Sequence, residues 1–177
     1  MWFLYVVLGV GLLGVYLYNR LIVLKMRVNN SWRQIDVQLK RRVDLIPNLI
    51  ETVKGYASHE KELFAKVTEL RSIIAGGGSV KEISEANNML TGALKSLFAV
   101  AEAYPALKAN QNFLMLQEEL SGTENKIAFA RQFYNDTVMI SAVQVFPNNM
   151  VATIFSFKEA EYFAIPEEEG EVTKVSF

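Results

Sequence analysis

The chain has 177 residues, a formal net charge of −1, 51% hydrophobic residues and no cysteine. A nearly neutral chain gives no electrostatic reason to expect nucleic-acid binding, and the lack of cysteine excludes disulfides and thiolate metal ligands. The residues that follow the first apolar segment are enough for one domain with a substantial core.

The first 18 residues, MWFLYVVLGVGLLGVYLY, carry no charged side chain. As a helix with a rise of ~1.5 Å per residue they would just cross the apolar core of a bilayer. We expect residues 1–19 to be an uncleaved transmembrane anchor, because no basic stretch precedes the run and bulky residues end it. The residues expected at the membrane interface are aromatic or basic: Trp2, Tyr5, Tyr16, Tyr18, Arg20, Lys25 and Arg27.

Charge also predicts the orientation of the chain. Basic residues follow the apolar run, and such flanks stay on the cytoplasmic side, so we expect the N-terminus outside and residues 20–177 inside. We divide this part into a helical bundle with a basic stem, residues 20–157, and an acidic, largely extended tail, residues 158–177. Membrane lipid is therefore an expected partner of the stem.

The first two helices after the anchor are predicted from apolar residues spaced three or four apart. One continues from the anchor over residues 21–56, with Pro47 expected to kink or restart it. A second runs over residues 58–74, beginning at Ser58. Its inward residues are Leu63, Val67, Leu70 and Ile74.

Two further long helices complete the predicted bundle. Ser79 and Glu82 form the pattern of a capping box that opens the third helix, which Pro105 ends. A fourth covers residues 110–145, and a short helix or turn after it is expected to bury Met150, Ile154 and Phe155. The prediction is an all-α fold: an antiparallel up-and-down four-helix bundle preceded by one N-terminal transmembrane helix.

Few side chains are suited to catalysis or metal binding. His59 is the only histidine, whereas a di-iron or zinc site needs at least a second histidine or cysteines. The glycines at 76–78 lack the lysine that a phosphate-binding loop requires and are interpreted as a linker. We therefore expect no metal, no cofactor and no enzymatic activity.

Four polar residues fall on the apolar stripes and are predicted to point inward: Arg42, Asn87, Glu124 and Arg131. Buried charges are costly unless they are paired. One interpretation is a structural ion-pair layer in which Glu124 binds Arg42 or Arg131 and fixes the helix register. The other is a pocket in which the arginines bind an anion or an acidic side chain of a partner.

Several long segments resemble the LemA family. They are YNRLIVLKMRVNNSW, IDVQLKRRVDLIPNLIETVKGYASHE, YPALKANQNFLMLQEELSGTENKIAFARQFYND and VFPNNMVA. The resemblance implies a membrane-anchored bacterial protein with an outward N-terminus and a cytoplasmic four-helix bundle. It implies no catalytic residues, because the family has no established activity.

Two functions remain open from the sequence. The first is a membrane-tethered interaction or scaffold module that binds other membrane proteins or copies of itself. The second is a sensor that binds a small anion at Arg42 and Arg131 and passes a change to the membrane helix through a bend at Pro47.

Overall fold

The computed structural model describes residues 1–141 and 146–164, and all regular secondary structure within them is helical. Val145 and most of the acidic tail lie outside the described residues. The described chain forms two compact units. We call residues 1–35 with 130–162 the span unit, and residues 36–129 with Phe163 and Ala164 the ion-pair unit.

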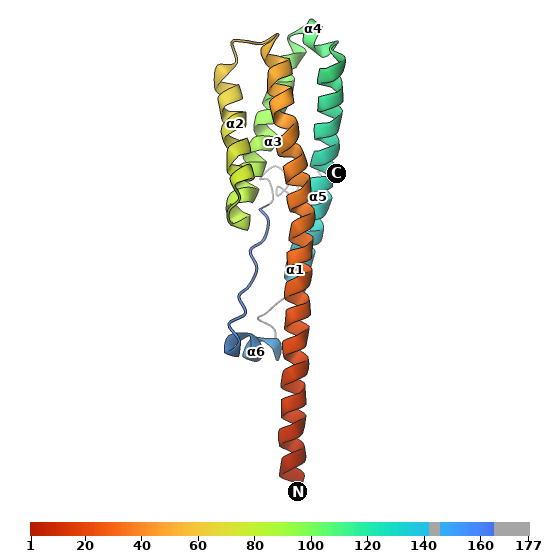
Figure 1. Cartoon of the computed structure of the whole chain (residues 1–177), viewed down its shortest axis with the longest axis vertical. Helices are drawn as coiled ribbons and strands as arrows, with labels where there is room; N and C mark the ends of the chain where they lie inside the picture. Colours follow the sequence, from red (N-terminus) through yellow and green to blue (C-terminus); the bar gives the residue numbers. More distant parts are fainter. Residues whose placement is uncertain (142–145, 165–177) are drawn as a thin grey trace, which may run out of the picture. The chain divides into compact units, whose positions relative to one another are not determined.

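Helix α1, Trp2–Lys54, is a single helix that contains Pro47 (Figure 1). The prediction that the helix restarts at Pro47 is therefore wrong, and a kink there stays a prediction. Proline has no N–H to donate to the carbonyl oxygen of Val43, one turn earlier. Arg71 replaces the missing donor, because its Nε lies 3.0 Å from that oxygen. The helix thus continues with the freed carbonyl satisfied by a neighbouring helix.

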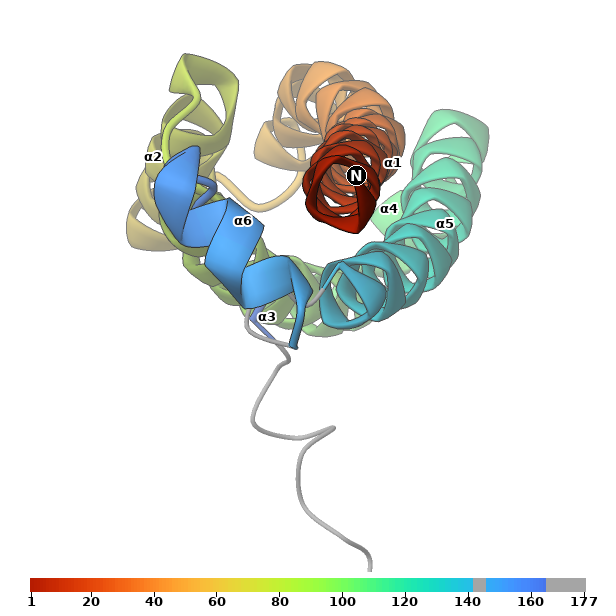
Figure 2. The same cartoon turned by 90° about the horizontal axis from the view of Figure 1, so that it is seen from below.

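Helices α2, Lys61–Gly76, and α3, Val80–Glu102, pack side by side (Figures 1 and 2). The predicted start of α2 at Ser58 is wrong, since the helix begins three residues later without a side-chain cap. Phe64, rather than Leu63, is buried at its start. The linker turns at Gly77, whose φ of 74° suits glycine. The capping box of Ser79 and Glu82 is confirmed.

Pro105 does more than end the third helix. It opens the short helix α4, Pro105–Lys108, after which α5 runs over Gln111–Ile140. Apolar residues from α1, α2, α3, α4 and α5 form the core of the ion-pair unit. Its most deeply buried members include Leu39, Ile46, Leu49, Val53, Val67, Leu90, Leu97, Leu107 and Ile127.

The last helix, α6, covers Asn148–Ile154. The prediction that it buries Met150, Ile154 and Phe155 is wrong, because all three are exposed and the buried apolar pair is Val151 and Ala152. Apolar residues occupy both faces of this short helix, so the sequence pattern does not identify the inner one. The small residues face inward because they allow close approach to α1.

The segment after α6 has no regular structure, as expected for the start of the tail, yet it is anchored. Phe163 is fully buried in the ion-pair unit, and the carbonyl of Ala164 accepts a hydrogen bond from Asn88 Nδ2 at 3.3 Å. Within the span unit, the hydroxyl of Tyr134 donates to the carbonyl of Glu161 at 2.7 Å. The described tail is therefore held by α5 just before Tyr162 and by α3 just after it.

Candidate functional site

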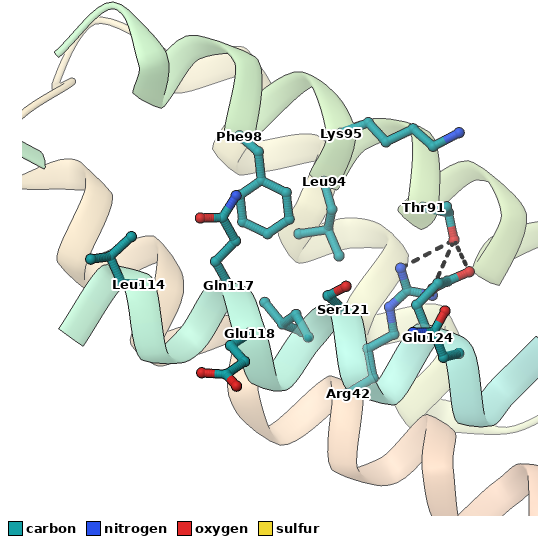
Figure 3. Close-up of a pocket in the computed structure, with 12 residues that line it drawn as sticks. Arg42, Thr91, Leu94, Lys95, Phe98, Leu114, Gln117, Glu118, Ser121 and Glu124 are labelled. Carbon is teal, nitrogen blue, oxygen red and sulfur yellow. Dashed lines mark hydrogen bonds and ion pairs between the residues drawn. The ribbon is translucent and has the colours of Figure 1, made fainter. Parts of the chain in front are cut away.

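A buried arginine organises the polar centre of the ion-pair unit. Arg42, on α1, is 2% exposed, and its Nη1 lies 2.6 Å from a carboxylate oxygen of Glu124 on α5. The side chain of Glu124 is 35% exposed, so the carboxylate keeps contact with solvent while the guanidinium does not. Figure 3 shows the two side chains meeting below Thr91 of α3.

Two residues of α3 also accept hydrogen bonds from the guanidinium of Arg42. Asn87 Oδ1 accepts from Nη1 at 2.7 Å, and Thr91 Oγ1 accepts from Nη2 at 3.1 Å. The Thr91 hydroxyl also lies within 3.3 Å of both carboxylate oxygens of Glu124. We call these four residues the Arg42 cluster. It joins three helices, and two of its members are fully buried.

The electrostatics of the cluster are those of a buried cation that needs its partner. Burial lowers the pKa of Arg42, and the charge of Glu124 raises it part of the way back. Burying a charge without a partner is expensive, so the nearby carboxylate stabilises the charged guanidinium. Arg42 Nε has no hydrogen-bond partner among the described residues.

A groove of about 490 Å³ lies beside the cluster, between α3 and α5 (Figure 3). Leu94 and Phe98 of α3 and Leu114 and Leu120 of α5 provide most of its apolar lining. Polar residues complete the lining: Arg42, Thr91, Lys95, Gln117, Glu118, Ser121, Glu124 and Asn125. An apolar groove with polar edges suits a side chain or a short helical segment better than a strongly hydrated ion.

The structure brings together three of the four polar residues predicted to point inward. Arg42, Asn87 and Glu124 are in one cluster, whereas Arg131 is half-buried and belongs to the span unit. Sequence reasoning missed Thr91. A signal existed, because Thr91 follows Asn87 by four residues and so shares its helix face.

A second ion pair links the same two helices at the surface. Arg41 Nη2 lies 2.6 Å from Glu119 Oε2, and both side chains are 49% exposed. Exposed pairs of this kind contribute little to stability. This pair therefore serves as a natural reference for the buried one.

In the span unit, α1 is long and apolar enough to cross a membrane. Trp2, Tyr5 and Tyr16 are exposed, as are Arg20, Lys25 and Arg27. Tyr18 is half-buried, because its ring packs 4.7 Å from that of Phe155. Trp32 is also half-buried, with its ring 5.6 Å from that of Tyr134.

Over the residues that the structure describes, the fold and these sites define a class: an all-helical protein with one candidate membrane-spanning helix and a polar cluster buried between helices. No group of three or more potential metal ligands occurs in the described parts of the chain. The model of the LemA family matches residues 31–177. The chain therefore belongs to the LemA family.

Relatives of known name are distant. Magnetosome protein MamQ 2 of Paramagnetospirillum magneticum is 25% identical over 174 residues, which cover 82% of this chain and 64% of the relative. MamQ of Magnetospirillum gryphiswaldense is 24% identical over 174 residues, which again cover 82% of this chain and 64% of the relative. Protein LemA of Metamycoplasma hominis is 29% identical over 131 residues, which cover 71% of this chain and 58% of the relative. The chain thus spans less than two thirds of the length of these relatives.

Proposed function

We propose that this protein is a membrane-anchored, non-enzymatic helical interaction module. The apolar part of α1 holds it in the membrane, with the N-terminus outside and the remainder cytoplasmic. The basic residues Arg20, Lys25 and Arg27 directly after the apolar run support this orientation. The partners are other membrane proteins or further copies of the chain.

The ion-pair unit is proposed to be an antiparallel up-and-down four-helix bundle made of α1, α2, α3 and α5. The short connections between successive helices support this topology. The Arg42 cluster supports it too, since it draws side chains from three of those helices. In this bundle the cluster fixes the register of α1 against α3 and α5.

The observation that carries the interaction function is a second apolar stripe on α5. In the ion-pair unit, Met115 and Phe129 are exposed and lie fourteen residues apart, which places both on one line of the helix. In the span unit, Phe133 and Ile140 are exposed and lie seven residues apart, which places them on one line in the same way. The buried residues of α5 lie on the opposite side, as with Leu120. Exposed apolar rows of this kind are typical of surfaces that bind another helix.

The alternative function, sensing of a small anion, is supported by the Nε of Arg42 beside the groove, which has no hydrogen-bond partner within the described part of the chain. The pairing with Glu124 argues against it, because an anion would have to displace a carboxylate at 2.6 Å. Thermal melting with a panel of anionic metabolites separates the two functions. An anion present at about 100 times its dissociation constant would add about 2.7 kcal/mol of stability, whereas an interaction module shows no shift.

A photo-crosslinking amino acid placed at Phe129 or Phe133 of the full chain, in its own membrane, tests the interaction function directly. We expect position-specific adducts with membrane proteins or with the chain itself. The same amino acid at the exposed residue Lys66 of α2 is the matched control. Equal labelling from all three positions, or no adduct from Phe129 and Phe133, would contradict the proposal.

A further inference from the structure

Helix α6 divides its apolar side chains between two faces. Val151 and Ala152 form a buried cluster with Leu17 and Leu21 of α1. On the open side, Met150 is 60% exposed and Ile154 is 74% exposed. Two phenylalanines flank the helix, and Phe146 is 74% and Phe155 55% exposed. So many large apolar groups on so short a segment mark a surface that something covers.

The position of α6 on α1 suggests what covers this surface. Leu17 and Leu21, on which it docks, lie where the apolar run ends and Arg20 begins the basic stem. Helix α6 runs across the direction of α1 in both views (Figures 1 and 2). When α1 crosses a bilayer, α6 therefore lies along the bilayer surface, at the level of Tyr18.

The charge pattern at this level is that of a membrane surface contact. The sequence has no charged residue between Asp136 and Lys158, and no acidic residue before Asp36. Lys25 lies with its Nζ 5.8 Å from the centroid of the Phe157 ring. Neutral apolar groups that enter the headgroup region, with lysine and arginine beside them, are the features of helices that lie on anionic bilayers.

A cavity next to α6 has the same character. It measures about 280 Å³ and is lined by Leu21, Leu24 and Val28, with Lys25 and Lys158 among its polar residues. A lining that combines apolar side chains with two lysines fits a lipid with an anionic headgroup.

We propose that α6 is a second membrane contact, which inserts Phe146, Met150, Ile154 and Phe155 into the headgroup region of an anionic bilayer. The inference rests on the proposed membrane anchor. A helix of this length would bind membranes weakly by itself, but α1 holds it at the surface at high effective concentration. Two contacts then restrain the span unit against rotation about the axis of α1.

The chain has no cysteine, so single cysteines report depth without background. The full chain is reconstituted in vesicles of phosphatidylglycerol and phosphatidylcholine, with an environment-sensitive fluorophore at Met150→Cys or Ile154→Cys. Spin-labelled lipids then quench the fluorophore. We expect a blue-shifted emission and several-fold stronger quenching by shallow spin labels than for Ile73→Cys, an exposed apolar position of α2. Circular dichroism checks that each variant is folded.

Each outcome bears on the inference. Weak quenching at positions 150 and 154 with strong quenching at Leu12→Cys would overturn the α6 contact and leave the anchor intact. Weak quenching at all of these positions would overturn the anchor as well. A shielded, blue-shifted label that lipids do not quench would identify a protein surface against α6 and also overturn the inference. Loss of quenching when phosphatidylglycerol is omitted would support the anionic headgroup as the source of the attraction.

Discussion

The two compact units can be compared through the contacts that join their helices. The ion-pair unit contains Arg42 with Glu124 and Arg41 with Glu119, each joining α1 to α5 through charge. The span unit contains aromatic contacts of Tyr18 with Phe155 and of Trp32 with Tyr134, and the ion-pair unit contains one between Phe98 and Phe113. Charged contacts respond to the loss of a single partner, whereas apolar packing responds to lost volume.

The largest expected effect is that of removing Glu124. In Glu124→Ala the guanidinium of Arg42 stays buried without its carboxylate partner. We expect this to lower the free energy of unfolding of the ion-pair unit by about 3 kcal/mol. The partial exposure of Glu124 and the bonds from Asn87 and Thr91 place the effect at the lower end of buried pairs. Hydrogen exchange of the full chain measures the loss helix by helix.

The matched control is Glu119→Ala, which breaks the exposed pair and should cost less than about 0.5 kcal/mol. Replacing both Arg42 and Glu124 by leucine should restore most of the stability, because no unpaired charge then remains. Equal effects of Glu124→Ala and Glu119→Ala would mean that burial does not distinguish the two pairs. If Glu124→Ala raised hydrogen exchange in α6 as much as in the ion-pair unit, the two units would not respond differently to the loss of this charge.

The next largest effect concerns the carbonyl that Pro47 leaves without an N–H donor. Arg71→Met removes the donor that serves the carbonyl of Val43 in place of that N–H. We expect the free energy of unfolding to fall by about 1.5 kcal/mol, as for a hydrogen bond from a charged group. In a Pro47→Ala background the helix supplies its own N–H, so the same substitution should cost much less. A double-mutant cycle measures this coupling. Additive effects would mean that Arg71 does not compensate for the proline.

A third prediction sharpens the comparison from the span unit. Tyr134→Phe removes the hydrogen bond to the carbonyl of Glu161 and should cost about 1 kcal/mol while keeping the ring packed against Trp32. Exchange should rise near Tyr134 and stay unchanged around Arg42. A matched change at the exposed residue Tyr162, Tyr162→Phe, should have no measurable effect.

The same tyrosine predicts a dependence on pH. Burial, with a smaller effect of the charge of Glu161, raises the pKa of Tyr134 to about 12. In the unfolded chain the tyrosine loses its proton near pH 10. The contribution of Tyr134 to the stability of the fold is therefore complete below about pH 10 and declines as the pH rises toward 12. Melting curves of wild type and Tyr134→Phe should therefore converge over this range. A constant difference would contradict the assignment.

The smallest effect is expected at the start of α3. Ser79→Ala removes the side-chain cap and should cost roughly 0.5–1 kcal/mol. Hydrogen bonds from Ser79 hold the pKa of Glu82 below its ordinary value, so this contribution is present at neutral pH and is lost as the pH falls below about 4. Melting of wild type and variant as a function of pH tests both statements, with Ser96→Ala as the exposed control.

How far the sequence predicts this molecule depends on how local each feature is. Apolar periodicity locates α2, α3 and α5 to within a few residues, and the Ser79 cap needs only four neighbouring residues. The sequence wrongly predicts a restart of the helix at Pro47, because the donor that satisfies the carbonyl of Val43 comes from another helix. The sequence left open whether Glu124 pairs with Arg42 or with Arg131, and the pairing with Arg42 depends on tertiary packing. The same holds for the inner face of α6, which the small residues Val151 and Ala152 decide.

The Arg42 cluster also constrains the order in which the protein can mature. Arg42 leaves the ribosome well before its partners, since Asn87 follows it by 45 residues and Glu124 comes later still. The hairpin of α2 and α3 is local and can form early. The guanidinium must nevertheless stay hydrated until α5 is synthesised and supplies the carboxylate. Closure of the ion-pair unit is therefore a late event in biosynthesis, and a nascent chain that stops before Glu124 remains open.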